Sequence, residues 1–272
     1  MLHERFRAAP VVRERLDGSV PALVHEAWAR DFPWIVQGTT IARGPGLPEG
    51  DAFDLGLFTG ASPEHEVRAR WTRLLGATGM RRAVHARQVH GADVRLHEPA
   101  DAGEPGGLSL LEACDGHATE APGVLLAVTV ADCVPVFVVD AARRAVALLH
   151  AGWRGTAAGV LERGLALLGA RAAAGSRAGA GAAELHVHLG PAICGACYEV
   201  GPEVFAVLGL PVPEAPRPLD LRAVLAARAL AAGVEPGRIT VSGHCTRCTG
   251  SGLFSHRSGD RGRQVAYLGI RP

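Results

Sequence analysis

The sequence predicts a single mixed α/β domain built around several buried strands. Its 272 residues suit one large domain or two small ones, and 48% of them are hydrophobic while 20% are charged, as in ordinary globular proteins. Three apolar runs rich in β-branched residues, at 124–130, 134–139 and 145–149, are typical of strands buried on both faces. Segments of helical character precede and follow this group of strands, and the chain has neither an internal repeat nor a clear linker.

The N-terminal segment carries a turn signal. The pair Asp17-Gly18 is typical of a tight hairpin turn. We therefore expect residues 1–30 to form an extension or a hairpin and residues 31–272 to form the one main domain. The run 34–37 predicts the first strand of that domain.

A helix is predicted to begin at Ser62. Ser62 would be its N-cap and Pro63 its first residue, which are positions that serine and proline favour. We expect the helix to extend to Leu75 and to stop near Gly76, because glycine often ends helices.

The remaining elements follow in order along the chain. A polar loop at 99–107 precedes the apolar runs, and the low-complexity segment 174–183 is expected to be a disordered surface loop. The further expected strands are 82–89, 185–189, 239–241 and 265–270, and the further expected helices are 156–173, 202–208 and 219–232.

Composition excludes several kinds of chemistry. The chain contains no lysine and no asparagine, and its 28 basic side chains are all arginine. A Schiff-base lysine and a Walker-type phosphate lysine are therefore excluded. The formal net charge of +1 gives no overall attraction to nucleic acid or to an anionic membrane, so we expect neither as a partner.

Nothing in the sequence resembles an export signal. Residues 1–10 lack an apolar run, and no stretch of about 18 apolar residues predicts a transmembrane helix. We expect a cytoplasmic protein whose six cysteines are thiols or metal ligands rather than disulfides.

Three side chains that suit a metal ion lie at the ends of predicted strands. His90 follows the strand 82–89, Cys133 lies between two apolar runs, and His150 ends the run 145–149. Residues at strand ends face the loops where substrates bind. Two imidazoles and a thiolate would hold Zn²⁺ with a fourth position open to water, and the same donors would bind Cu²⁺ strongly.

Other interpretations of these residues stay open. Cys133 could be a buried structural thiol while the histidines fill polar gaps, or Cys133 could be a nucleophile that His150 activates. The neighbouring Asp132 could transfer a proton, support a metal ligand, or cap the break between the strands.

The other candidate residues are four cysteines and three arginines. The pairs Cys194/Cys197 and Cys245/Cys248 each have the C-x-x-C spacing and could hold a second zinc ion or could be four reduced thiols. Arginines on glycine-rich segments could bind phosphate or carboxylate through two oxygens, or could belong to a solvated basic loop. These arginines are Arg154, Arg257 and Arg263.

Six short motifs occur in a characteristic order. They are Gln88-Val89-His90-Gly91-Ala92-Asp93, Ala131-Asp132-Cys133-Val134-Pro135, His150-Ala151-Gly152-Trp153-Arg154-Gly155, Gly190-Pro191-Ala192-Ile193, Cys197-Tyr198-Glu199-Val200-Gly201 and Phe254-Ser255-His256-Arg257. In this order the chain resembles the YfiH-type family, also called the laccase-domain or polyphenol oxidase family, over residues 34–270.

The resemblance implies a layered α/β/β/α fold and a specific activity. The activity is phosphorolysis of purine nucleosides (adenosine, inosine, methylthioadenosine) together with deamination of adenosine, so a purine nucleoside and phosphate are the expected partners. It implies metal ligation, and a catalytic role, for His90, Cys133 and His150. Zn²⁺ is the expected cofactor and Cu²⁺ the alternative. We add Asp132 as a further catalytic candidate, and Arg154, Arg257 and Arg263 as substrate ligands.

Three other functions remain as alternatives. The first is a copper-binding polyphenol oxidase, although a multicopper oxidase needs several histidine-rich clusters and the sequence offers one His-Cys-His set. The second is a hydrolase that edits peptidoglycan precursors with Cys133 as its nucleophile. The third is a metal-binding protein without enzymatic activity.

The chain departs from the family pattern near its N-terminus. The segment 37–40 lacks the usual arginine, Asp54 stands in place of an asparagine, and Ala69, in the pair Ala69-Arg70, stands in place of another. Near the C-terminus, His256 stands in place of a tyrosine. If the amides contact the nucleoside in the family, its binding would differ here.

Overall fold

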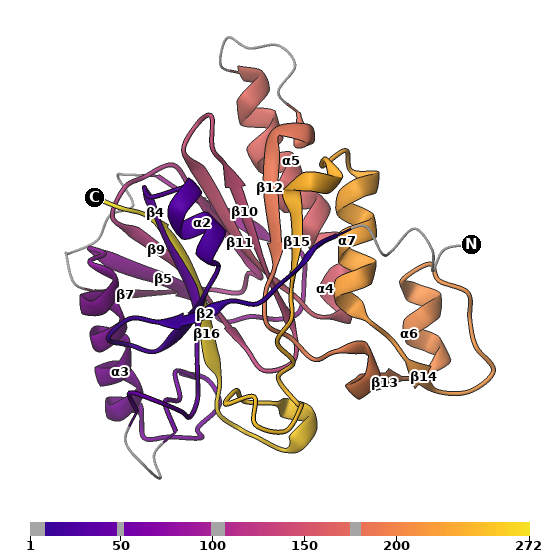
Figure 1. Cartoon of the computed structure of the whole chain (residues 1–272), viewed down its shortest axis with the longest axis horizontal. Coiled ribbons are helices and arrows are strands. Elements are labelled where there is room, and N and C mark those ends of the chain that lie inside the picture. Colours follow the sequence, from indigo (N-terminus) through magenta and orange to yellow (C-terminus); the bar gives the residue numbers. More distant parts are fainter. Residues whose placement is uncertain (1–8, 48–51, 99–106, 175–180) are drawn as a thin grey trace.

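The computed structural model describes residues 9–47, 52–98, 107–174 and 181–272. Two seven-stranded mixed sheets lie face to face, with helices on both outer sides (Figure 1). The predicted mixed α/β class and the α/β/β/α layering are confirmed. Most residues of the loops expected at 99–107 and 174–183 lie outside the described ones.

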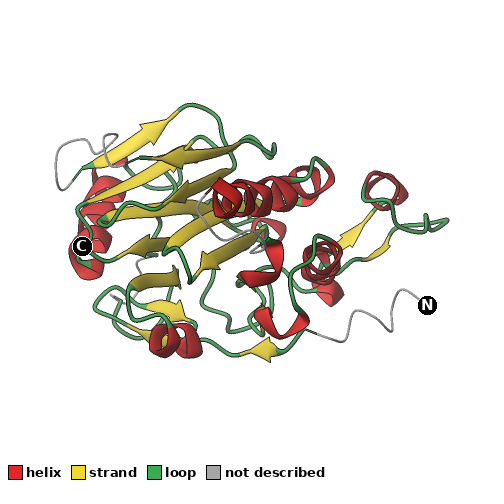
Figure 2. Ribbon diagram, turned by 90° about the horizontal axis from the view of Figure 1, so that it is seen from above, coloured by secondary structure: helices red, strands yellow, loops and turns green. Residues whose placement is uncertain are grey.

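The first sheet has the strand order β1-β15-β12-β10-β11-β8-β6, and the second has the order β2-β3-β4-β16-β9-β5-β7. A separate ribbon of two strands, β13 and β14, lies to one side of both sheets (Figure 2). The strands of the first sheet are β1 (Val11–Val12), β6 (Val94–His97), β8 (Gly116–Thr119), β10 (Val134–Asp140), β11 (Ala145–Ala151), β12 (Leu185–Leu189) and β15 (Ile239–Ser242). Those of the second are β2 (Arg15–Asp17), β3 (Ala22–Val24), β4 (Ile35–Thr40), β5 (Arg82–Ala86), β7 (Leu108–Leu111), β9 (Val124–Val130) and β16 (Gln264–Ile270), and those of the ribbon are β13 (Glu199–Val200) and β14 (Arg217–Pro218).

Helices cover the outer face of each sheet. The first sheet packs against α5 and α7, and the second packs against α3, whose Trp71 and Leu74 are buried. Asp220 caps α7 by accepting hydrogen bonds from the backbone N–H groups of Arg222 and Ala223. The α-helices with described bounds are α2 (Glu26–Asp31), α3 (Glu64–Thr78), α4 (Trp153–Ala157), α5 (Val160–Ala174), α6 (Pro202–Val207) and α7 (Leu221–Ala231).

Side chains of the central strand β10 alternate between two apolar cores. Val136 and Val138 pack with the helices on the outer side of the first sheet, whereas Phe137 and Val139 pack between the two sheets. Neither face of β10 meets solvent. This explains why its sequence is continuously apolar rather than alternating.

The connection between β9 and β10 carries the chain from one sheet to the other. Strand β9 pairs with β16 and β5 in the second sheet, whereas β10 pairs with β11 and β12 in the first. Residues 131–133 alone join the two strands. Cys133 therefore lies where the chain crosses between the sheets.

The predicted bounds of the first long helix are wrong at both ends. The N-cap of α3 is Pro63 rather than Ser62, and the helix continues through Gly76 to Thr78. Buried contacts of Leu75 and Thr78 hold this last turn in helical form. The helix ends at Gly79, whose φ of 67° is left-handed.

Two other predicted elements also have different bounds. Strand β5 ends at Ala86 rather than at residue 89, because the Gln88 side chain bonds to both the backbone N–H and the carbonyl of Thr129 and so replaces strand pairing. The helix expected at 156–173 is two helices, α4 and α5, separated near Gly159, whose φ is 85°.

The N-terminal segment contributes to both sheets. The hairpin predicted at Asp17-Gly18 is confirmed, since β2 and β3 pair in antiparallel fashion and extend the second sheet, while β1 pairs with β15 in the first. Short elements such as α2, β6, β7 and β8 were not predicted. The domain boundary expected at residue 30 stays a prediction.

None of the helices in the described part of the chain has the length and apolar character that crossing a membrane requires.

The two glycines near the end of α3 should respond oppositely to alanine. A Cβ at either position meets no neighbouring atom within 4 Å, so packing is not affected. Gly79→Ala should lower the free energy of unfolding by about 1 kcal/mol, because a side chain is strained at a left-handed φ. Gly76→Ala should raise it by about 0.5–1 kcal/mol, because alanine is the better helix former. Urea denaturation of the two variants would measure both values, and destabilisation by Gly76→Ala would contradict the helix end assigned here.

Candidate metal and substrate site

Three predicted ligands converge at one end of the two sheets. His90 follows β5 in the second sheet, His150 lies on β11 in the first, and Cys133 lies on the connection between the sheets. One ligand atom from each of the three lies within 4.8 Å of the others. The rings of His90 and His150 meet edge to face, with centroids 4.9 Å apart.

The thiol and the imidazole in this group alter each other's pKa. Burial raises the pKa of Cys133, but His150 and His90 outweigh burial and lower it to about 6. Burial lowers the pKa of His150, but the Cys133 thiolate and Asp115 outweigh burial and raise it to about 9. Cys133 is thus poised as a thiolate, which is the form that binds metals or attacks as a nucleophile.

Asp115 holds this group together and was not predicted. Its carboxylate is fully buried and accepts a hydrogen bond from His150 Nδ1 at 2.9 Å. It also accepts hydrogen bonds from the backbone N–H groups of Val89, His90 and Gly91, at 3.2, 2.9 and 2.7 Å. Burial raises the pKa of Asp115, yet these hydrogen bonds outweigh burial and lower it below its usual value.

The backbone is strained at one of the three candidate ligands and next to another. His90 has a φ of 59° and Asp132 has a φ of 87°, both in the left-handed region that side chains other than glycine rarely adopt. Such strain persists only where surrounding contacts enforce it, and it is common at functional sites. For His90, the hydrogen bonds from its own backbone and that of Gly91 to Asp115 provide the enforcement.

The donor set fits a zinc ion. Two imidazole nitrogens and a thiolate leave a fourth tetrahedral position open, and a carboxylate bonded to the second nitrogen of a histidine is typical of zinc sites. The neighbouring Gly152 leaves the necessary room, because a Cβ there would lie 3.0 Å from Cys133 Sγ and 3.1 Å from His90 Cδ2.

A cavity of about 610 Å³ opens directly above the three ligands. This volume lies within the range of small-molecule sites. Three aromatic side chains and four arginines are among its lining residues. The described lining residues outside the three ligands are Gly56, Leu57, Phe58, Thr59, Arg87, Gln88, Thr129, Ala131, Asp132, Gly152, Trp153, Arg154, Tyr198, His256, Arg257 and Arg263.

The arginines of the cavity differ in how far their side chains are already engaged. Arg257 Nη1 donates to the carbonyl of Glu199, and Arg263 Nη1 lies within 3.4 Å of three backbone carbonyls. The guanidinium group of Arg154 stacks over the ring of Trp153 at 4.2 Å and makes no hydrogen bond to any described residue. It is therefore available to an anion in the cavity. Arg87, which sequence analysis did not select, also lines the cavity.

The carboxylate of Asp132 forms hydrogen bonds with two loops around the cavity. Neither partner is one of the three candidate metal ligands. Its Oδ1 accepts from Thr246 Oγ1 at 2.6 Å, and its Oδ2 accepts from the backbone N–H of Arg257 at 2.7 Å. The carboxylate thus ties together two segments that are distant in sequence.

The departures from the family pattern occupy different places. Asp54 is buried and accepts from the backbone N–H groups of Gly56 and Arg263, both of which line the cavity. It therefore shapes the cavity wall without being among the lining residues. His256, in contrast, is an exposed lining residue.

Some residues that line the cavity were not predicted from the sequence. Phe58 is 54% exposed and Tyr198 is half-buried, and both are aromatic lining residues of the cavity. No short-range signal marks Phe58 or Arg87. Asp115 directly precedes β8, a strand that was not predicted, so its position at a strand end was not recognised.

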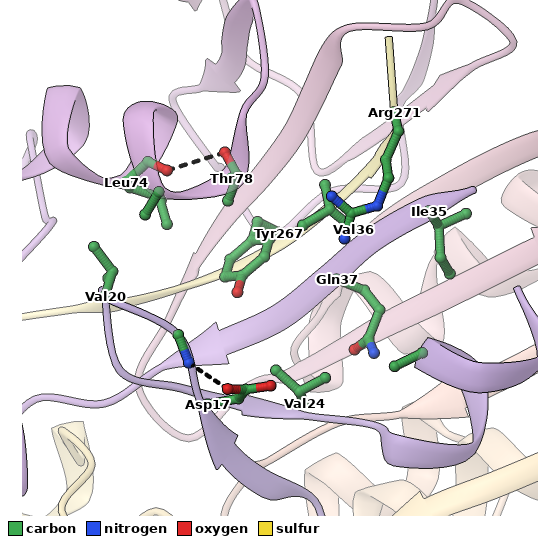
Figure 3. Close-up of a pocket in the computed structure, with 13 residues that line it drawn as sticks. Asp17, Val20, Val24, Ile35, Val36, Gln37, Leu74, Thr78, Tyr267 and Arg271 are labelled. Carbon is green, nitrogen blue, oxygen red and sulfur yellow. Dashed lines mark hydrogen bonds between the residues drawn. The ribbon is translucent and has the colours of Figure 1, made fainter. Parts of the chain in front are cut away.

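A smaller cavity of about 200 Å³ lies elsewhere, between the β2–β3 hairpin and α3. Figure 3 shows Tyr267 and Gln37 beside this cavity, with Asp17 near its rim. None of the described residues that line it is a cysteine or a histidine. It therefore lacks the donors that distinguish the larger cavity.

The four cysteines of the two C-x-x-C pairs also converge. Their sulfur atoms lie within 4.8 Å of one another. Burial raises the pKa of Cys245, but hydrogen bonds from the backbone N–H groups of Cys194, Arg247 and Cys248 outweigh burial and lower it to about 7. All six cysteines of the chain are free thiols in this structure.

Relatives of the chain carry names that concern purine nucleosides. A "Purine nucleoside phosphorylase YlmD" of Geobacillus stearothermophilus is 35% identical over 89% of this chain and 93% of its own length. A "Purine nucleoside phosphorylase" of Deinococcus radiodurans is 32% identical over 84% of this chain and 87% of its own. An "Adenosine deaminase RL5" from an unknown prokaryote is 36% identical over 54% of this chain and 58% of its own.

Solved structures match the whole fold. The crystal structure of Bacillus licheniformis hypothetical protein YfiH has a TM-score of 0.82 at 28% identity and covers 95% of this chain and 99% of its own. The YlmD structure from Geobacillus stearothermophilus has a TM-score of 0.81 at 30% identity and covers 97% and 100%. Residues 38–271 match the family described as "Multi-copper polyphenol oxidoreductase laccase". The chain therefore belongs to this YfiH/laccase-like family.

Proposed function

We propose that the chain is a metal-dependent purine nucleoside phosphorylase that accepts adenosine, inosine and methylthioadenosine and also deaminates adenosine. One observation carries the proposal: a His-Cys-His metal-ligand set forms the floor of a cavity lined by arginines and aromatic rings. The names of the relatives support the same activities. The six free thiols support a reducing compartment, which we propose to be the cytoplasm.

His90, Cys133 and His150 would hold the ion, for which we propose zinc, with copper as the alternative. When bound, zinc would act as a Lewis acid toward an oxygen of phosphate or water. Asp115 would keep His150 in the orientation that directs its second nitrogen toward the ion.

The arginines and rings would bind the two substrates. The Arg154 guanidinium group could hold two phosphate oxygens, and Arg87 is a second cation that lines the same cavity. The exposed ring of Phe58 offers a stacking surface for a purine. Burial raises the pKa of Tyr198 to about 12, so its hydroxyl stays protonated and can donate a hydrogen bond to the substrate.

Both proposed reactions need only the nucleoside and either phosphate or water as reactants. Phosphorolysis breaks the bond between C1′ of the ribose and the purine nitrogen, forms a bond from C1′ to a phosphate oxygen, and releases the purine with a proton. Deamination replaces the amino group of adenine with an oxygen from water and releases ammonia. Asp132 would position the loops of Thr246 and Arg257 around these substrates rather than transfer the proton.

A second candidate function also has a specific observation behind it. The Cys133 thiolate, His150 and Asp115 form a chain of hydrogen-bonding groups typical of cysteine hydrolases. This arrangement supports the alternative of a hydrolase that acts on a peptidoglycan precursor. Removal of metal distinguishes the candidates, because a cysteine nucleophile needs none.

Substrate assays test the proposed activity directly. Zinc-loaded protein with inosine and phosphate should yield hypoxanthine and ribose 1-phosphate, whereas adenosine without phosphate should yield inosine. Cys133→Ala and His150→Ala should lose both activities and the ion, while the control His65→Ala, which changes an exposed histidine of α3, should retain them. Chromatography of products and elemental analysis provide the readouts. Turnover of nucleosides by metal-free protein would contradict the metal role.

The role of Asp115 can be separated from that of a nearby aspartate. Asp115→Asn should weaken zinc binding by about 10- to 100-fold. The carboxylate of Asp115 orients His150 and accepts hydrogen bonds from three backbone N–H groups, and a neutral amide cannot replace all of these contacts. The control Asp93→Asn changes an aspartate whose side chain is 77% exposed and should leave the affinity unchanged. Competition with a chelating dye measures both. Equal affinities in the two variants would refute the positioning role.

The phosphate ligand can be tested by splitting the two activities. Arg154→Lys should raise the phosphate KM roughly 10-fold, because lysine cannot bind two oxygens in one plane and about 1.5 kcal/mol of charge-assisted bonding is lost. Deamination, which uses no phosphate, should change much less. The control Arg163→Lys alters an exposed surface arginine paired with Asp93. If Arg154 only fixes the turn, both activities and the melting temperature should fall together.

A further inference from the structure

Two loops outside the His90 site bring four cysteines together. One loop follows β12 and carries Cys194 and Cys197, and the other follows β15 and carries Cys245 and Cys248. Strands β12 and β15 are parallel neighbours, so their C-terminal ends lie at the same edge of the first sheet. A bridge between Ala192 and Cys245 extends this pairing into the loops.

The distances between the sulfur atoms fit one tetrahedral ion. All four lie within 4.8 Å of one another, and Cys197 Sγ lies 3.9 Å from Cys248 Sγ. Zinc–sulfur bonds of about 2.3 Å in tetrahedral geometry place the sulfur atoms about 3.8 Å apart. A disulfide would need about 2.05 Å, so this pair is reduced here. An iron–sulfur cluster with two irons would require terminal sulfur atoms that are farther apart.

The surroundings of the cluster suit a structural rather than a catalytic ion. Cys245 is buried and its sulfur accepts a hydrogen bond from the backbone N–H of Cys194 at 3.2 Å, a contact that stabilises a ligating thiolate. Arg247 lies beside it and donates to the carbonyl of Cys197 at 3.0 Å, which places a positive charge next to the thiolates. Four protein ligands complete the coordination and leave no position for a substrate.

We propose that Cys194, Cys197, Cys245 and Cys248 bind one structural zinc ion, distinct from the ion held at His90, Cys133 and His150. The ion closes the two loops on each other at the edge of the sheet. Thiolate ligands select zinc over the hard cations magnesium and calcium.

The ion would also fix one wall of the substrate cavity. Tyr198 follows Cys197 directly and lines the cavity, and Thr246 follows Cys245 and donates to Asp132 at 2.6 Å. Arg257 lies over the ring of Tyr198 at 5.1 Å and bonds to Asp132 as well. Each loop that the ion joins therefore contributes a residue to the same network. The cysteines act on the cavity through these neighbours and are positioning residues.

Elemental analysis of the full chain, purified with a reductant and passed through a gel-filtration column, tests the proposal. The wild type should contain two zinc ions per chain, and Cys133→Ala should retain one. Cys248→Ser should also contain one ion, held at Cys133. The control Thr249→Ala, which alters the exposed neighbour of Cys248, should contain two.

Cobalt substitution identifies which ligands hold each ion. Cys133→Ala loaded with Co²⁺ should show the intense thiolate-to-metal absorption of a four-sulfur site, and the same chain with Cys248→Ser added should lose it. Cys248→Ser alone should melt at a lower temperature than the wild type, because a structural ion contributes folding free energy.

Three results would overturn the proposal. One is a wild type with a single ion that Cys133→Ala removes. Another is a Cys197–Cys248 disulfide, detected by mass spectrometry in reductant-purified protein. The third is iron in place of zinc. If Cys248→Ser fails to fold, the comparison of the wild type with Cys133→Ala still decides the count.

Discussion

The geometry of the candidate site depends on one buried carboxylate. Asp115 accepts hydrogen bonds from three consecutive backbone N–H groups around His90 and from the ring of His150. These contacts hold His90 in a left-handed conformation that it would not otherwise adopt. The carboxylate is fully buried, and losing any one partner would leave part of its charge uncompensated. Two candidate metal ligands that are 60 residues apart in sequence, His90 and His150, are therefore positioned by the same carboxylate.

The cavity next to Asp115 and the candidate ligands offers two kinds of binding surface, which are arginine charges and aromatic rings. The guanidinium group of Arg154 stacks on Trp153 without a hydrogen bond to a described residue, whereas Arg257 belongs to a network with Asp132 and Tyr198. Such a division suits a pair of substrates in which one is an anion and the other a planar base. In the proposed four-cysteine site, Cys197 directly precedes Tyr198 of this network, so an ion held there would link the rigidity of an edge of the sheet to the shape of the cavity.

The strands next to the candidate site could be predicted from the sequence, whereas most side-chain contacts within the site could not. The apolar runs around Cys133 and before His150 marked β9, β10 and β11 correctly, and the three ligands were selected from their positions at strand ends. Asp115 was missed because its partners lie 25 and 35 residues away, at positions that become neighbours only once β8 pairs with β11. The two C-x-x-C pairs could not be joined from spacing for the same reason, since the parallel register of β12 and β15 brings them together. The end of α3 was misplaced because burial of Thr78 outweighs the low helix propensity of Gly76.

The crossing of the chain between the two sheets has a mechanical consequence. His90 lies on the connection from β5 of the second sheet to β6 of the first, His150 belongs to the first sheet, and Cys133 lies on the three-residue connection from β9 to β10. An ion held by all three would act as a cross-link between the layers, much as a disulfide does between distant segments. Its binding energy would then add to the cohesion of the whole sandwich, since the three donors are together only when the sheets are packed. Metal binding and packing of the inter-sheet core would therefore be coupled, so that loss of the ion would weaken the core and unpacking of the core would release the ion.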